Sequence, residues 1–159
     1  MYFREQPILQ DIDAVADILL RSGFFNDEEQ KVGVSLVRER LEQGEKSLYF
    51  FQFAQEFADS KPIGYSCFGP IPGTKFSYDL YWIAVDPNFQ RQGIGAHLLE
   101  HSETEIKRRG GRRIYIETSS QPLYQPTRNF YAHHGYILEG RQTDYYAPQD
   151  DKLLYVKWW

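Results

Sequence analysis

A short glycine-containing segment has the residue types and spacing of an anion-binding turn. It follows the apolar segment 78–85 and reads Gln90-Arg91-Gln92-Gly93-Ile94-Gly95-Ala96. Glycines let a backbone approach a ligand closely, and the free N–H groups at a helix start carry partial positive charge. The segment therefore predicts a phosphate-binding turn from a strand into a helix, although a tight turn without a ligand has the same pattern.

The spacing of these glycines excludes two common phosphate sites. A Walker loop requires G-x-x-x-x-G-K-[ST], and a dinucleotide fingerprint requires three glycines in G-x-G-x-x-G. Neither pattern occurs in residues 90–96. Any phosphates bound there would therefore belong to a different kind of ligand.

Composition limits how such a ligand is held. The chain has 159 residues, with 18 Lys and Arg against 22 Asp and Glu, which gives a net charge of −4. Because there is no overall basic field to attract nucleic acid, an anionic ligand must be bound locally. The length predicts a single domain over residues 1–159.

Cysteine content and apolar segments bear on the compartment. The single cysteine, Cys67, can form neither an internal disulfide nor a CxxC metal site. Residues 1–7 lack the apolar run of a signal peptide, and no uninterrupted apolar segment reaches the length of a membrane span. We therefore expect a cytoplasmic protein that binds neither membrane nor nucleic acid.

Apolar periodicity predicts two helices and then three strands in the first half of the chain. Helical spacing covers 11–23, with Asp11 as the expected N-cap and Gly23 as the stop, and it covers 27–44. Aromatic and β-branched residues predict strands over 47–57, 62–68 and 78–85. Turn residues between these segments favour an antiparallel meander.

The second half alternates helices and strands. A helix over 95–109, ended by Gly110 and Gly111, leads to a strand over 113–117, so that 78–117 forms a βαβ unit. A helix over 126–134 stops at Gly135, a strand starts at 136–138, and 152–159 forms the last strand. These elements predict an α/β protein with a mixed sheet and helices on both faces.

Two motifs resemble signatures of the GNAT superfamily of N-acetyltransferases. Gln90-x-x-Gly93-x-Gly95 resembles its [Q/R]-x-x-G-x-[G/A] acyl-CoA signature, and 129–136 resembles its second signature, an aromatic-Tyr pair followed by a Gly-aromatic step. The order of elements is similar over essentially the whole chain. The resemblance implies a mostly antiparallel central sheet and an acetyl-CoA-dependent N-acetyltransferase that uses no metal.

The resemblance also implies which residues bind the coenzyme. Backbone groups of 92–96 would bind its pyrophosphate, with Arg91 adding charge, while the backbone of 83–85 would pair with the pantetheine arm like an added strand. The implied coenzyme residues are Ile83, Ala84, Val85, Gln90, Arg91, Gln92, Gly93, Ile94, Gly95 and Ala96. One position departs from the family pattern, because Tyr124 stands where many members have a coenzyme-contacting asparagine.

Acetyl transfer to an amine needs a base, because an alkylamine is mostly protonated at neutral pH, and the departing thiolate gains from a proton donor. The resemblance implies Tyr131 as the donor and Glu117 as the base. Asp79 is the competing base, and a water chain is a third route. A core tyrosine and solvated carboxylates at strand ends are the plainer interpretations of the same residues.

The acceptor is the least determined part of the resemblance. Family members build its pocket from the first two helices and the loop before the last strand, here about 21–35 and 139–151. These segments contain the acidic residues Glu28, Glu29, Asp144, Asp150 and Asp151 and the aromatic residues Phe24, Phe25, Tyr145 and Tyr146. Such a set suits a cationic amine of a small molecule or a peptide. Arg128 is either an exposed arginine or a ligand for a carboxylate or phosphate, and a homodimer stays open.

Two rival interpretations belong to other functional classes. His97-Leu98-Leu99-Glu100-His101 fits the zinc-hydrolase pattern H-x-x-E-H, but both histidines lie off the apolar helix face, which favours a solvated surface. A domain of the same fold could also bind acyl-CoA without transferring the acyl group, as a sensor.

Overall fold

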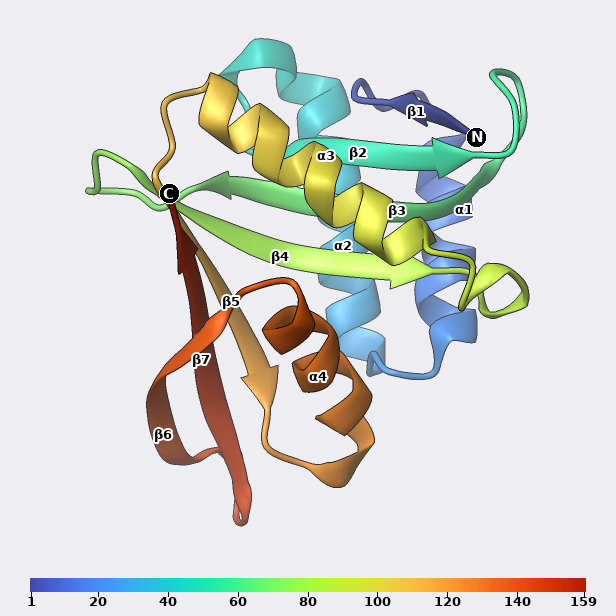
Figure 1. Ribbon diagram of the computed structural model, residues 1–159. Coiled ribbons are helices and arrows are strands. Elements are labelled where there is room, and N and C mark those ends of the chain that lie inside the picture. Colours follow the sequence, from blue (N-terminus) through green and yellow to red (C-terminus); the bar gives the residue numbers. More distant parts are fainter. The chain divides into compact units, whose positions relative to one another are not determined.

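The computed structural model describes all 159 residues, and its strands form one mixed sheet in the order β1-β2-β3-β4-β5-β7-β6 (Figure 1). The strands are β1 (Tyr2–Arg4), β2 (Phe50–Gln55), β3 (Pro62–Pro70), β4 (Ser77–Val85), β5 (Arg113–Ser119), β6 (Ile137–Ala147) and β7 (Asp150–Trp158). The helices are α1 (Asp11–Ser22), α2 (Asp27–Gln43), α3 (Ile94–Arg108) and α4 (Gln125–His133), with short 3-10 turns η1 (Gly44–Lys46), η2 (Pro87–Phe89) and η3 (Pro122–Tyr124). The predicted mixed α/β architecture is confirmed, and no helix combines the length and the apolar character that crossing a membrane requires.

The chain divides into two compact units that share β4. The first unit contains residues 1–69 and 80–105, and the second contains residues 70–79 and 106–159. Within the first unit, α1 and α2 lie on one face of the sheet and α3 lies on the other (Figure 1). The first face buries Val15, Leu19, Val37, Phe53 and Tyr65, and the second buries Ala54, Ile63, Ile94 and Leu98.

Helix α1 begins and ends where the periodicity predicts, but the prediction of Asp11 as its N-cap is wrong. Gln10 occupies the N-cap position, while Gly23 ends the helix with φ +74° as expected. The Asp11 carboxylate is fully buried and accepts two hydrogen bonds of 2.8 Å from Arg4, together with one from the N–H of Ile8. Arg4 lies on β1, a strand that the sequence analysis did not predict, so the partner that draws Asp11 inward was missed.

In the second unit, β4 and β5 are parallel, as the predicted βαβ unit requires. Residues 77–79 of β4 pair with residues 113–115 of β5, and β7 pairs antiparallel with both β5 and β6. Helix α4 lies beside β5 (Figure 1). The buried residues of this unit include Ile114, Ile116, Tyr131, Leu153 and Tyr155.

The expected loop over 139–151 is wrong, because most of it is the edge strand β6. Nearly every residue of β6 is exposed on both faces, so the strand lacks the alternation of apolar and polar residues that marks a half-buried strand. Pairing passes from Gln142 with Lys152 to Ala147 with Asp150. Residues 143–146 therefore lie opposite Asp151 alone and form an irregular bulge with several extra residues, which we call the β6 bulge.

Gly69 on β3 tolerates no side chain, and this predicts a stability effect. A Cβ at residue 69 would lie 2.3 Å from the backbone oxygen of Leu48. We expect Gly69→Ala to lower the free energy of unfolding by about 1–3 kcal/mol, because backbone must move to relieve the overlap. Gly140→Ala is the control, since the nearest atom to its Cβ is 3.7 Å away. Equal melting temperatures for the two variants would contradict this packing argument.

Candidate active site

The glycine-containing segment forms a turn from β4 into α3 within the first unit. Gly93 takes φ +80° and Arg91 takes φ +61°, so both lie in the left-handed region. A Cβ at Gly93 would meet nothing within 4 Å. The backbone conformation, rather than crowding, therefore favours glycine there, and the side of the turn that a Cβ would occupy is open.

The start of α3 presents backbone N–H groups beside this turn. The N–H of His97 donates to the carbonyl of Gly93 at 3.1 Å, which is the first bond of the helix. The N–H groups of residues 94–96 precede that bond and have no acceptor within the helix. Ile94 is buried and anchors the helix, while Gly95 and Ala96 are partly exposed. The predicted strand-turn-helix is confirmed, and its polar end suits an anion.

Side chains around the turn hold its shape. The buried Asp86 carboxylate accepts from the N–H of Asn88 at 2.9 Å and from the guanidinium of Arg21. Gln90 donates through its side-chain amide to the carbonyl of Val85 at 3.3 Å. Gln90 therefore braces the exit from β4, so its side chain serves the turn itself.

In the second unit, Glu117 belongs to an ion pair. Its Oε1 atom accepts a hydrogen bond of 3.1 Å from Nζ of Lys152 on the neighbouring strand β7. The Lys152 ammonium also lies 4.1 Å from the ring centre of Tyr145, in the β6 bulge. Glu117 remains 50% exposed. The carboxylate predicted at this strand is thus open to solvent on one side and neutralised on the other.

Asp79 differs from Glu117 in having no ion-pair or hydrogen-bond partner for its carboxylate. It is partly buried in β4, opposite Tyr115 of β5. Burial first, and then repulsion from Glu117, raises the pKa of Asp79 to about 6, while Lys152 lowers it. A carboxylate that titrates near neutral pH is suited to take a proton from a reacting group.

Tyr131 lies inside the second unit on α4. Its side chain is 7% exposed, and its ring packs edge-on against Phe130 and Tyr136 at 5.3 and 5.6 Å between ring centres. Burial raises the pKa of Tyr131, so its hydroxyl keeps its proton at any ordinary working pH. The phenol therefore stays a potential proton donor, as the prediction for this residue requires.

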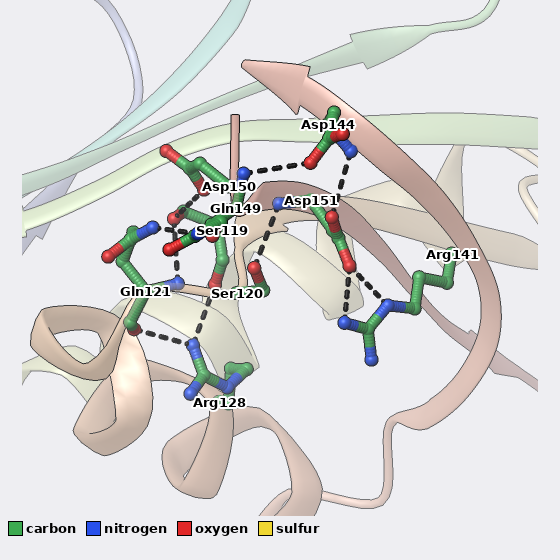
Figure 2. Close-up of polar contacts among 9 residues, drawn as sticks. All are labelled: Ser119, Ser120, Gln121, Arg128, Arg141, Asp144, Gln149, Asp150 and Asp151. Atoms are coloured by element: carbon green, nitrogen blue, oxygen red, sulfur yellow. Dashed lines mark hydrogen bonds and ion pairs between the residues drawn. The ribbon is translucent and has the colours of Figure 1, made fainter. Parts of the chain in front are cut away.

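Arg128 is an internal brace, contrary to the expectation of an exposed arginine or of a ligand for a carboxylate or phosphate (Figure 2). Its guanidinium donates to the carbonyls of Ser119 and Gln121 at 2.7 and 3.0 Å and to the side chain of Gln125 at 2.8 Å. Only 9% of the residue is exposed. The brace ties the segment after β5 to α4.

Loss of this brace should destabilise the second unit. We expect Arg128→Met to lower the free energy of unfolding by about 2–4 kcal/mol, because it leaves the carbonyls of Ser119 and Gln121 without their charged donor. Thermal or urea unfolding measures the effect. Arg112→Met is the control, since the Arg112 guanidinium lies over the Phe76 ring at 4.5 Å and is exposed. An Arg128→Met protein as stable as the control would contradict the assignment.

The acidic residues expected near an acceptor amine are largely engaged (Figure 2). The buried Asp151 carboxylate pairs with Arg141 and accepts the N–H of Asp144 at 2.8 Å, and these contacts lower its pKa. Asp150 accepts from the hydroxyl of Ser119, and Asp144 accepts from the N–H of Gln149 at 2.8 Å. Asp151 therefore shapes the β6 bulge and is not open to an amine.

The histidines of the H-x-x-E-H pattern form no metal centre. His97 is exposed and its Nδ1 lies 4.0 Å from Glu100, while the His101 ring stacks on Phe3 at 4.1 Å. No group of three or more His, Cys, Asp or Glu side chains has an arrangement that could hold a metal ion.

Comparison with known proteins settles the family of this chain. Residues 12–136 match the acetyltransferase (GNAT) family. The chain belongs to that family. A GNAT-family structure from Desulfovibrio desulfuricans has 40% sequence identity and a TM-score of 0.95, over 99% of this chain and 98% of the other. The fold predicted from the resemblance is therefore confirmed.

Two further relatives of this GNAT protein bear on its chemistry. The [ribosomal protein bS18]-alanine N-acetyltransferase of Escherichia coli K12 is 50% identical over 38 residues, which is 24% of this chain and 26% of that protein. The PaiA N-acetyltransferase of Thermoplasma acidophilum was solved in complex with coenzyme A. It has 19% identity and a TM-score of 0.76 over 100% of both chains, which supports the fold alone.

The two units of this GNAT protein divide the predicted site residues between them. The first unit contains all ten coenzyme residues, 83–85 and 90–96, and the second contains Glu117, Tyr131 and Asp79. Lys152 was not among the predicted site residues, because its partners Glu117 and Tyr145 come from other strands. Residues 150–155 read Asp-Asp-Lys-Leu-Leu-Tyr, without alternation of polar and apolar types, so no local pattern indicated which face of the sheet Lys152 would take.

Proposed function

We propose that this protein is an N-acetyltransferase that moves an acetyl group from acetyl-CoA to a primary amine by direct attack in a ternary complex. The observation that carries the proposal is Asp79, a partly buried carboxylate that has no partner and whose pKa is raised to about 6. Such a group is deprotonated at neutral pH and still basic enough to take a proton. Membership of the GNAT family supplies the reaction class.

The turn into α3 supports acetyl-CoA as the co-substrate. Its positive-φ glycine, Gly93, has open space on the side that a Cβ would fill, and the N–H groups of 94–96 are free of helical acceptors. These groups would hold the coenzyme pyrophosphate, with Arg91 nearby and the backbone of 83–85 along the pantetheine arm. Acetyl-CoA supplies an acetyl thioester, and no metal is invoked.

The second unit would supply the proton transfers. Asp79, with Glu117 beside it, takes one proton from the acceptor ammonium, and the neutral amine then forms the new N–C bond. Tyr131 donates its phenolic proton to the thiolate left when the C–S bond breaks. The nitrogen of the new N–C bond loses its remaining excess proton to solvent, and the tyrosine is reprotonated from solvent.

The acceptor would be a cationic amine of a small molecule or a peptide. The aromatic pair Tyr145 and Tyr146 is exposed, with ring centres 5.0 Å apart, and Glu117 keeps one open side. Aromatic faces and carboxylates together bind ammonium groups. The E. coli relative acts on an alanine of a ribosomal protein, so a peptide N-terminus belongs in any panel of acceptors.

Release of the coenzyme A thiol tests the proposal. Acetyl-CoA is incubated near pH 8 with polyamines, amino acids, aminoglycosides or short peptides, and the free thiol is followed with a chromogenic disulfide. Turnover with one class of amine would establish the enzyme and identify its acceptor class. Failure of every amine, with acetyl-CoA still raising the melting temperature, would favour a non-catalytic acyl-CoA sensor. Absence of both responses would contradict the coenzyme site.

A further inference from the structure

Lys152 on β7 contacts both a carboxylate of β5 and an aromatic ring of the β6 bulge. Its ammonium donates to Oε1 of Glu117 at 3.1 Å and lies 4.1 Å from the Tyr145 ring centre, and the side chain is only 13% exposed. We propose that Lys152 is a positioning residue that engages the Glu117 carboxylate in an ion pair and leaves Asp79 as the unpaired carboxylate that accepts a proton from the acceptor amine. This inference rests on the proposed acetyl transfer.

The two contacts of Lys152 come from different strands, Glu117 from β5 and Tyr145 from β6. Burial lowers the pKa of Lys152, but the hydrogen bond and charge of Glu117, together with Tyr145, outweigh that effect and raise it. The ammonium therefore stays charged at neutral pH. An ammonium stabilises the ionised form of a carboxylate near it, which is why Lys152 lowers the pKa of Asp79.

The β6 bulge explains why Tyr145 reaches Lys152. Asp151 accepts the N–H of Asp144 and pairs with Arg141, which fixes the bulge in which Tyr145 lies (Figure 2). Asp144 takes φ +52°, so the chain turns sharply at that residue. A regular hairpin without the extra residues would not project a ring over Lys152. The Lys152 ammonium is thus held by two contacts, one with the Tyr145 ring and one with the Glu117 carboxylate.

The charges on this face leave the Asp79–Glu117 pair dependent on Lys152. By register and strand alternation, the charged and titratable groups on the face that Asp79 shares are Tyr81 of β4, Arg113, Tyr115 and Glu117 of β5, Asp150 and Lys152 of β7, and Tyr145 of the β6 bulge. Arg113 lies over the Trp158 ring at 5.4 Å, and Asp150 accepts from Ser119. Without Lys152, neither carboxylate would have a cation bonded to it, and the pKa of Asp79 would rise because the lowering effect of Lys152 would be lost.

The pH dependence of kcat/KM tests this role in the whole protein with the best acceptor from the thiol-release panel. For Lys152→Met we expect the acidic limb of the profile to move up by about one pH unit, with activity returning toward the wild-type value at high pH. Lys152→Arg keeps a cation and should retain the wild-type limb. Lys107→Met is the matched control, because the Lys107 ammonium also lies over an aromatic ring, Trp159, at 4.5 Å.

A limb that stays at the wild-type pH in Lys152→Met, or a uniform loss of activity at every pH, would overturn the proposal. If Lys152→Met does not fold, Tyr145→Leu serves instead, since it removes one of the two contacts of the ammonium and should move the limb in the same direction. A limb unmoved in Tyr145→Leu would count against the proposal equally.

Carboxyl carbon NMR separates this inference from the proposed function. The Asp79 signal should titrate near pH 6 in the wild-type protein and about one pH unit higher in Lys152→Met, whether or not any amine turns over. An unmoved Asp79 midpoint would overturn the inference even if the enzyme is active. A shifted midpoint in a protein without turnover would support the charge arrangement and contradict the acetyl transfer.

Discussion

Asp79→Asn is expected to reduce kcat/KM about a hundredfold at pH 7, because an amide cannot accept the proton that a positioned base removes. In the wild-type protein the pKa of about 6 means that the Asp79 carboxylate is ionised above that pH. Activity should therefore rise as the pH increases toward 6 and then level off. In Asp79→Asn this limb should disappear. Initial rates of thiol release from pH 5 to 9 measure both effects.

The pH dependence of thermal stability tests the raised pKa of Asp79 independently of activity. The pKa of Asp79 is raised from 3.8 in the unfolded chain to about 6 in the folded protein, so the folded state binds this proton more tightly. The stabilisation that comes from this tighter proton binding is fully present below the unfolded pKa of Asp79 and is lost as the pH rises through 6. Asp79→Asn should consequently melt a few degrees higher than the wild type at pH 7.5, and the difference should vanish near pH 3.5.

Glu117→Gln is the matched variant, since Glu117 shares the face of Asp79 but is paired with Lys152. If Glu117→Gln removes the acidic limb while Asp79→Asn retains it, Glu117 is the base and the assignment of Asp79 is wrong. If both variants keep the wild-type profile, a water chain carries the proton. The same set of rates therefore distinguishes the three candidates for the base.

Tyr131→Phe is expected to lower kcat about tenfold or more while leaving the affinity for acetyl-CoA nearly unchanged. The substitution removes only the hydroxyl that would protonate the thiolate, and the ring keeps its contacts with Phe130 and Tyr136. Single-turnover rates give the chemical step, and calorimetric titration with acetyl-CoA gives the affinity.

Tyr155→Phe is the control for loss of a buried phenol from the same unit, because Tyr155 lies on β7 at 9% exposure and has no proposed role. Its kcat should stay within about twofold of the wild type, which is about 0.4 kcal/mol in the activation free energy, because the Tyr155 hydroxyl has no proposed role in the reaction. Equal turnover for Tyr131→Phe and the wild type would remove the proton-donor assignment and make Tyr131 a core tyrosine.

Local sequence determined the elements that depend on neighbouring residues. Helical spacing together with Gly23, Gly110 and Gly135 predicted where α1, α3 and α4 end, because a residue with positive φ breaks the helix and glycine adopts that conformation readily. The turn at 90–96 was predicted for the same reason. A capping box from Asn26 to Glu29 opens α2, and its Asn-x-x-Glu spacing is visible in the sequence as well, although it was not among the predicted features.

Only the tertiary structure decided which charges meet. Asp11 is drawn to Arg4 of β1, Arg128 to carbonyls after β5, and Lys152 to Glu117, and none of these pairings follows from local pattern. The physical reason is that strand order and register bring together residues far apart in the chain, and one residue of slip would turn each side chain to the other face. Local sequence therefore predicted the family, the helices and the turn at 90–96, whereas strand order and register left the Asp79 carboxylate without a partner and paired Lys152 with Glu117.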